Sequence, residues 1–176
     1  MSTKPLCVFV GVMGAGKTTV GQLVADRLGV PFLDVDSDIE AVAGKPIPEI
    51  FIDDGEAHFR ALEREAVARA LATFDGVLAL GGGAIMADET RKRLLDHTVV
   101  YLSVEVADAV KRVGLGTGRP MLKMNPRATL RHLLDLRRPL YEEVATVVVH
   151  TDGRTPDEVT TAVLAALPTP TPPERS

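Results

Sequence analysis

A glycine-rich stretch near the amino terminus carries the strongest chemical signal in the sequence. The stretch "GVMGAGKTT" runs from Gly11 to Thr19 and matches the spacing G-x-x-x-x-G-K-[ST]. Glycines let successive backbone N–H groups curve around phosphate oxygens, and a following helix N-terminus adds partial positive charge. The stretch therefore predicts a nucleoside triphosphate site formed by Gly14, Ala15, Gly16, Lys17, Thr18 and Thr19.

Within this loop, two side chains have distinct chemistry. The ammonium of Lys17 is expected to reach the β- and γ-phosphates and to act in catalysis, and the hydroxyl of Thr18 is a ligand for Mg²⁺. A GTPase switch would also carry an N-K-x-D stretch, which the sequence lacks. A motor ATPase would place a carboxylate after the third strand, where this sequence has glycines. The pattern favours a small-molecule kinase over both.

Acidic residues follow the second apolar run in the stretch "DVDSD". A calcium-binding EF-hand loop is rejected, because Ile39 and Lys45 stand where that loop needs Gly and Glu. In an extended strand end, Asp34 and Asp36 would point to the same side. One could then approach Mg²⁺ while the other accepts a proton from an acceptor hydroxyl.

The alternative for these aspartates is a solvated helix N-cap cluster. That interpretation suits Ser37 or Asp38 better than Asp34 and Asp36. We therefore expect the latter two carboxylates to face the ligand crevice at the carboxyl edge of a parallel sheet.

Several arginines could recognise an anionic substrate. Arg60 lies four residues after Glu56 and three before Glu63, so a neighbouring carboxylate could fix its guanidinium. Arg119 stands in "GRPML" and Arg137 in "RRPLY". An isolated arginine is usually a solvated surface residue, but several around a phosphate site can bind carboxylates and phosphoryl groups in two-pronged fashion.

The elements that must position these residues alternate along the chain. Strands are expected at the short apolar runs 6–10, 31–35, 77–80, 98–102 and 145–150. Helices are expected where apolar residues recur at helical spacing, over 17–28, 56–73, 87–96, 105–113, 127–136 and 156–167. Such alternation predicts an α/β fold with a parallel sheet.

The domain organisation is expected to be simple. Residues 1–167 fit one domain, and the aperiodic, charged segment at about 112–126 is expected to be a mobile lid. The Pro-rich residues 168–176 are expected to be disordered.

Composition limits the partners and the location. The chain has 176 residues, 45% of them hydrophobic, and a net charge of −4, which argues against nucleic-acid or anionic-membrane partners. Its one cysteine, Cys7, lies in an apolar run and is expected in the core. With no leader-like segment or membrane span in view, we expect a cytoplasmic protein. With no coiled-coil seam or large exposed apolar stripe evident, we expect a monomer.

The motifs together are more specific than any one of them. The order and intervals of "GVMGAGKTT", "DVD", "DGEAHFR", "GGG", "GRP" and "RRPLY" resemble those of the shikimate kinase family, over about residues 6 to 155. The resemblance implies a three-layer α/β/α P-loop kinase fold with a five-stranded parallel sheet and a mobile lid. It implies ATP-dependent phosphorylation of the shikimate 3-hydroxyl, giving shikimate 3-phosphate and ADP on the path to chorismate and the aromatic amino acids.

The resemblance also implies residue roles. Asp36 would hold the ring hydroxyls and is the candidate base, and Asp34 would join Thr18 in the Mg²⁺ shell. Arg60 and Arg137 would clamp the shikimate carboxylate, although Arg138 is an alternative to Arg137. Residues implied at the transferring phosphate and at the adenine end are Arg119, Arg112 and Arg154.

The resemblance also bears on the three consecutive glycines Gly81, Gly82 and Gly83. Side chains here would fill the space of a flat ring substrate, and backbone N–H groups could donate to it; Gly82 is singled out. For Gly81 or Gly83, a turn required only by backbone geometry remains open.

Two other functions are alternatives. Another small P-loop kinase, such as one acting on gluconate, would share the phosphate loop without needing both arginines and the glycine turn. A catalytically silent nucleotide-binding module would not need the acceptor residues at all.

Overall fold

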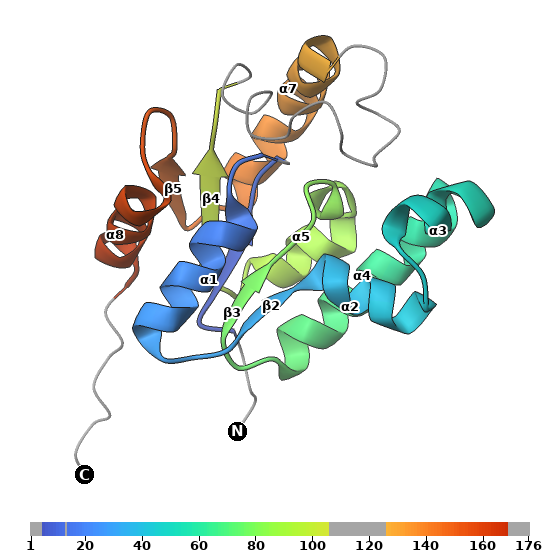
Figure 1. The fold of residues 1–176 in the computed structure, drawn as a ribbon, viewed down its shortest axis with the longest axis horizontal. Coiled ribbons are helices and arrows are strands. Elements are labelled where there is room, and N and C mark those ends of the chain that lie inside the picture. Colours follow the sequence, from blue (N-terminus) through green and yellow to red (C-terminus); the bar gives the residue numbers. More distant parts are fainter. Residues whose placement is uncertain (1–4, 13, 106–125, 169–176) are drawn as a thin grey trace.

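A single parallel sheet of five strands runs through the protein in the order β2-β3-β1-β4-β5 (Figure 1). The computed structural model describes residues 5–12, 14–105 and 126–168. Each strand overlaps one of the predicted apolar runs, which confirms the α/β prediction with its five-stranded parallel sheet. The strands are β1 Cys7–Val10, β2 Phe32–Asp34, β3 Val77–Ala79, β4 Val99–Ser103 and β5 Val147–His150.

The central strand is β1, which pairs with β3 on one side and β4 on the other. In this register, Val8 lies between Leu78 and Val99. Every residue of β1 is buried, because layers of helices cover both faces of the sheet. That burial explains why the strand is a continuous apolar run and not an alternating one.

Helices connect successive strands, and one more follows the last strand. The connecting helices are α1 Lys17–Leu28, α2 Val35–Ala43, α3 Ile47–Asp53, α4 Glu56–Thr73, the short 3₁₀ helix η1 Ala84–Met86, α5 Asp88–Leu94 and α7 Pro126–Val144, and α8 Pro156–Ala166 follows β5. Within the described ranges, no helix combines the length and apolarity that a membrane span requires.

The direction in which each connection crosses the sheet determines which face its helix covers. The chain moves from β1 outward to β2, and the later connections run in the opposite direction across the sheet. Because parallel crossovers are right-handed, α1 lies on one face and the later crossover helices lie on the other. Helix α8 returns to the first face and packs against α1 (Figure 1). This is the expected three-layer α/β/α arrangement.

The helices differ from expectation in two places. Helices α2 and α3 were not predicted, because they are short and α2 buries only Val35 and Ile39, too few positions to produce a helical period. Helix α7 continues through Pro139 to Val144, well beyond the expected end at residue 136. Proline normally ends a helix, but the buried Tyr141 anchors the part of α7 beyond it.

Some expectations concern segments that the structure does not describe. The expected helix over 105–113 lies outside the described residues except for Glu105, which is not helical. The expected lid also lies outside them except for Pro126, the first residue of α7. The expected tail lies outside them except for residue 168.

Candidate active site

The loop after β1 needs glycine at three positions. Gly14 and Gly16 have φ values of 85° and 94°, in the left-handed region that side chains disfavour. Gly11 lies so close to β4 that a Cβ would stand 2.7 Å from the Leu102 carbonyl oxygen. Helix α1 begins directly after Gly16, so its N-terminal N–H groups face the loop. The loop therefore has the backbone of an anion site.

Lys17 is folded across its own loop. Its Nζ donates to the carbonyl oxygens of Gly11, at 2.6 Å, and Val12, at 3.0 Å. The ammonium is thus held beside the loop, where the phosphates of a bound nucleotide could replace the carbonyls as acceptors.

Asp34 links the loop to α2. One oxygen, Oδ2, accepts from the Thr18 hydroxyl at 2.9 Å, and Oδ1 accepts from the backbone N–H of Asp36 at 3.0 Å. Asp34 is therefore the N-cap of α2. The expectation of an extended strand end at Asp36 was wrong: Asp36 lies in the first turn of α2. Aspartate is among the best N-cap residues, so the chain turns into a helix at once.

A cavity of about 580 Å³ opens at the carboxyl ends of the strands. Such crevices are where open α/β sheets bind ligands. The cavity joins the loop after β1, the end of β2, the turn after β3 and the segment after β5. Its lining consists of Gly14, Ala15, Gly16, Lys17, Thr18, Thr19, Val20, Asp34, Asp36, Ala79, Leu80, Gly81, Gly82, Thr151, Arg154, Pro156 and Val159.

The residues at this cavity fit a magnesium ion that is bound together with phosphates. The Thr18 hydroxyl and the Asp34 carboxylate are adjacent oxygen donors on its wall. Mg²⁺ usually takes only one or two protein ligands and completes its shell with phosphates and water. Among the described residues, no group of three or more His, Cys, Asp or Glu could hold a metal without such help.

The glycine turn after β3 makes room for the protein's own side chains. A Cβ on Gly81 would lie 2.9 Å from Asp36 Oδ1 and 3.2 Å from Glu63 Oε2. A Cβ on Gly83 would lie 2.5 Å from Arg60 Nη1. Neither glycine has a positive φ, so backbone geometry alone does not explain them. Gly81 and Gly82 line the cavity and Gly83 does not, so space for a ligand at all three glycines stays a prediction.

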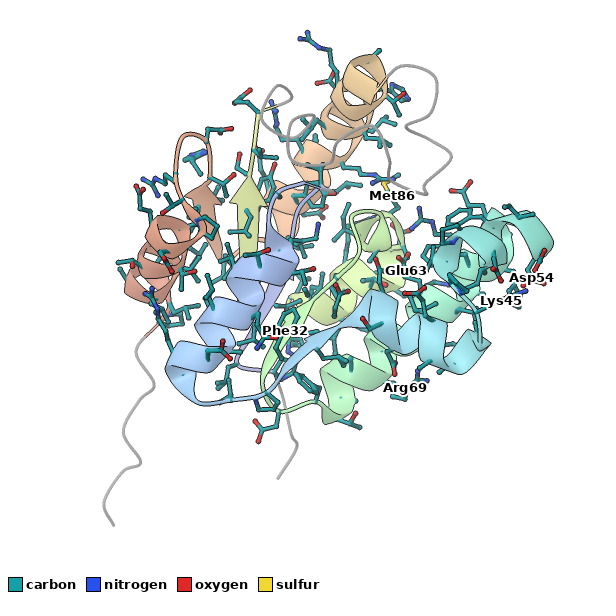
Figure 2. The ribbon with its side chains drawn as sticks, viewed as in Figure 1. Phe32, Lys45, Asp54, Glu63, Arg69 and Met86 are labelled. Atoms are coloured by element: carbon teal, nitrogen blue, oxygen red, sulfur yellow. The ribbon has the colours of Figure 1, made fainter. Side chains whose placement is uncertain are left out.

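Arg60 is held by a buried acid, as the sequence suggested. Its Nη1 lies 2.8 Å from Oε1 of Glu63, whose side chain is 4% exposed. Figure 2 shows Glu63 on α4. The guanidinium also lies 5.2 Å from the centre of the Phe59 ring and 3.7 Å from the Glu56 carboxylate.

Arg137 and Arg60 approach the same buried phenol. Burial raises the pKa of Tyr141, while the nearby positive charges of Arg137 and Arg60 partly oppose that rise. Arg137 is itself 6% exposed. Neither arginine lines the cavity. Arg60 lies next to Gly83 of the glycine turn, and Arg137 lies at Tyr141, whose hydroxyl contacts Gly82.

Its neighbour Arg138 points elsewhere. Burial raises the pKa of Tyr101, and hydrogen bonds with Ser103 and Arg138 oppose that rise. Because Arg138 lies at this β4 tyrosine, the structure favours Arg137 as the arginine of the acceptor side.

The far end of the cavity contains residues after β5. Arg154 lines it together with Thr151, Pro156 and Val159, which sequence reasoning missed; an adenine-side role for Arg154 stays a prediction. Tyr141 was missed too, although its spacing of four residues from Arg137 places both on one helix face. The expected site residues Arg112 and Arg119 lie outside the described residues.

Three comparisons bear on the identity of the chain. A protein named shikimate kinase from Salinispora arenicola (strain CNS-205) is 68% identical over 163 residues, which cover 93% of this chain and 98% of that protein. The structure described as shikimate kinase from Acinetobacter baumannii in complex with shikimate is 39% identical, with a TM-score of 0.87, and the match covers 92% of this chain and 91% of that one.

A gluconokinase from Sinorhizobium meliloti 1021 is more distant, at 24% identity and a TM-score of 0.58 over 92% of this chain and 90% of that one, so this likeness shows the fold alone. The family described as shikimate kinase matches residues 13–168. With that match and a relative 68% identical over most of its length, the chain belongs to the shikimate kinase family of P-loop kinases.

Proposed function

We propose that the protein transfers the γ-phosphoryl group of ATP to the 3-hydroxyl of shikimate. The observation that carries this proposal is the single cavity lined both by the phosphate loop and by Asp36, Gly81 and Gly82. Phosphoryl transfer depends mainly on holding donor and acceptor side by side. The shikimate bound by the relative from Acinetobacter baumannii supports the choice of acceptor.

In this proposal, one part of the cavity binds the nucleotide phosphates and another part binds the acceptor. The loop amides and Lys17 bind the phosphates, and Mg²⁺ held by Thr18 and Asp34 would neutralise their charge. Asp36 binds the acceptor hydroxyls and takes the proton that the 3-hydroxyl loses. Its side chain lies beside Gly81 on the cavity wall, within the part of the cavity assigned to the acceptor.

The arginines bind the remaining charges. Arg60 and Arg137 hold the shikimate carboxylate. The position of Arg60 against Gly83 and the place of Arg137 one helical turn before Tyr141, which contacts Gly82, support this. Arg154 contributes to the adenine end, where Pro156 and Val159 supply apolar surface. Arg119 at the transferring phosphate and Arg112 near the adenine are proposed from the sequence resemblance.

The substrate is tested by measuring ADP release with purified protein, ATP and Mg²⁺. Shikimate should stimulate ADP release far above the rate with ATP alone, and gluconate should not. Stimulation by gluconate instead would overturn the proposed acceptor. The need for Mg²⁺ is read in the same assay, since EDTA should abolish the stimulated rate and added Mg²⁺ should restore it.

The role of Asp36 is tested with a control on the same helix. Asp36→Asn should lower kcat by about 10²-fold or more, because general-base catalysis contributes about 10²–10⁴-fold. Asp38→Asn is the control, because Asp38 forms an ion pair at 2.9 Å with Arg69 of α4 and does not line the cavity. Arg69 is labelled in Figure 2. Equal kcat values in the two variants would contradict the assignment.

A further inference from the structure

Tyr141 makes a contact that connects α7 to the glycine turn. Its hydroxyl donates to the carbonyl oxygen of Gly82 at 2.5 Å, across 59 positions of sequence. The side chain is fully buried, and its ring stacks on Tyr101 with centroids 5.0 Å apart. A buried, stacked ring has little freedom, so the hydroxyl provides a fixed anchor for the turn.

The hydrogen bond to Gly82 fixes the position of more than one atom. A peptide unit is planar, so fixing the Gly82 carbonyl also fixes the N–H of Gly83 and the direction in which the chain leaves the turn. Glycine has no side chain that could hold this plane by packing. The phenol therefore supplies a constraint that the turn itself lacks.

The same plane borders the two arginines. The Cα of Gly83 lies against the Arg60 guanidinium. Arg137 precedes Tyr141 by four residues on α7, so both lie on one face of the helix. Tyr141 thus contacts the turn on the cavity wall and lies on the helix face of Arg137, while the turn itself lies against Arg60.

We propose that Tyr141 is a positioning residue for the acceptor site: it sets the plane of the Gly82–Gly83 peptide and keeps the glycine turn at a fixed separation from Arg60 and Arg137. It touches no reacting atom. The part of this proposal that concerns acceptor binding rests on the proposed function.

Tyr141→Phe removes the hydroxyl and keeps the ring, and Tyr101→Phe is its matched control. Tyr101 is also a buried tyrosine, 2% exposed, in the same stacked pair, but its hydroxyl contacts Ser103 and Arg138. Tyr141→Phe should raise the KM for shikimate about ten-fold or more, because it strips a partner from a buried carbonyl in the acceptor wall. The KM for ATP should stay within about two-fold in both variants.

Two kinetic outcomes would overturn the proposal. One is an equal rise of the shikimate KM in the two variants, and the other is a parallel rise of both KM values in Tyr141→Phe, which would indicate general loosening.

A second measurement does not depend on the acceptor. Amide hydrogen exchange over residues 81–86 should be about ten-fold faster in Tyr141→Phe than in Tyr101→Phe, because the turn loses its anchor. Unchanged exchange there would overturn the positioning role even if wild-type activity is as proposed. If exchange is faster in Tyr141→Phe but the wild-type protein does not phosphorylate shikimate, the anchoring role of Tyr141 stands and the proposed function is rejected.

Discussion

At the scale of single residues, the glycines of the turn shape the site as much as its charged side chains do. Gly83 admits the Arg60 guanidinium, and Gly81 admits the carboxylates of Asp36 and Glu63. The acceptor side is therefore built of charged groups packed against bare backbone. A Cβ added at Gly81 or Gly83 would therefore press on a charged side chain and not merely fill space.

Gly83→Ala should impair acceptor binding without unfolding the protein. The new Cβ would meet the Arg60 guanidinium at the end of a flexible side chain, which must shift. The fold should survive with some loss of stability, because Arg60 also pairs with the buried Glu63. We expect the shikimate KM to rise about ten-fold, as for the loss of one charge-assisted contact. Steady-state kinetics and thermal unfolding together check this.

The control for this change is Gly44→Ala. Gly44 has a φ of 74° and open space around it, so alanine there should cost about 1–2 kcal/mol of stability. The shikimate KM should not change. If Gly83→Ala behaved like Gly44→Ala, with lost stability and normal KM, its contact with Arg60 would not matter for binding.

Cys7 gives a prediction on pH dependence. Burial raises the pKa of the Cys7 thiol from 9.0 to about 12. Between these values the unfolded chain loses the thiol proton and the folded protein keeps it, so the free energy of unfolding should fall as pH rises above 9, by about 1.4 kcal/mol per unit. Cys7→Ala should lack this component in denaturant titrations at pH 8.5 to 10.5. An identical slope in both proteins would contradict the prediction.

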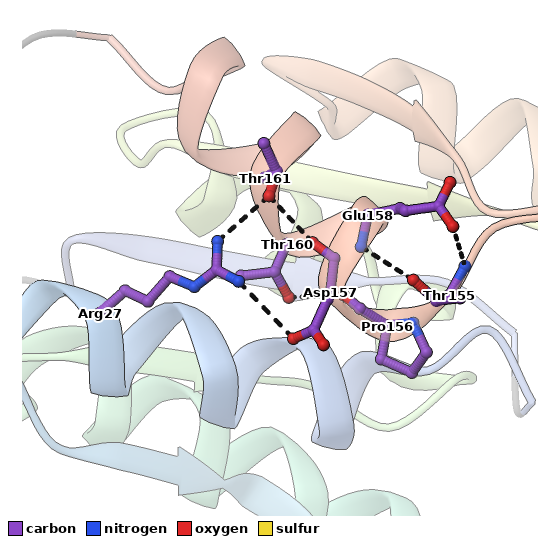
Figure 3. A network of polar contacts seen from close by, with 7 residues as sticks. All are labelled: Arg27, Thr155, Pro156, Asp157, Glu158, Thr160 and Thr161. Atoms are coloured by element: carbon purple, nitrogen blue, oxygen red, sulfur yellow. Dashed lines mark hydrogen bonds and ion pairs between the residues drawn. The ribbon is translucent and has the colours of Figure 1, made fainter.

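At the scale of elements, helix N-termini lie where ligands are expected. Helix α1 begins at the phosphate loop, α2 begins at Asp34, and α8 begins beside Arg154. Figure 3 shows how the last of these is secured: Thr155 Oγ1 accepts from the Glu158 N–H at 3.2 Å, and Glu158 Oε1 accepts from the Thr155 N–H at 3.4 Å. This capping box fixes the start of α8 next to the cavity.

Loss of this cap should destabilise the protein measurably. Thr155→Ala removes the acceptor for the Glu158 N–H and should cost about 1 kcal/mol, which lowers the Tm by about 2–4 °C for a chain of this length. Thr155→Ser keeps the acceptor and should stay close to wild type. Equal Tm values for the two variants, measured by calorimetry, would mean that the cap does not contribute.

At the scale of the whole molecule, the site is made by bringing strand ends together. Four strands contribute loops to one cavity, although the strands lie far apart in the chain. Ion pairs such as Lys45 with Asp54, at 2.6 Å, lie on other elements, at the ends of α2 and α3 (Figure 2). Because a bound ligand would contact loops from four strands, ligand binding should stabilise the whole fold.

Nucleotide should raise the Tm through Lys17. At a concentration of ADP about 100 times its Kd, stabilisation should be about 2.7 kcal/mol, or about 5–10 °C in Tm. Lys17→Ala should lose most of this shift at the same ADP concentration. Lys45→Ala, which removes a lysine outside the cavity lining, should keep it. A full shift in Lys17→Ala, seen by differential scanning fluorimetry, would contradict the role of Lys17.

The fold class and the phosphate loop could be predicted from the order of residues alone. Continuous apolar runs mark buried parallel strands, and the spacing of Gly11, Gly16 and Lys17 reflects constraints that act within a few residues. Such local constraints leave a readable pattern. Arg60 and Asp36 were predicted as site residues from the order of the motifs along the chain. That order gives no information on the positions and contacts of their side chains.

The folded structure was needed to show how the proposed acceptor side is assembled. It made Asp34 a helix cap joined to Thr18, placed Gly83 against Arg60, and brought Tyr141 to Gly82. Apart from the cap of Asp34 on Asp36, these contacts join residues that are distant in sequence, and their energy depends on strand order and helix packing. Because such contacts impose no spacing on the chain, no local pattern announces them.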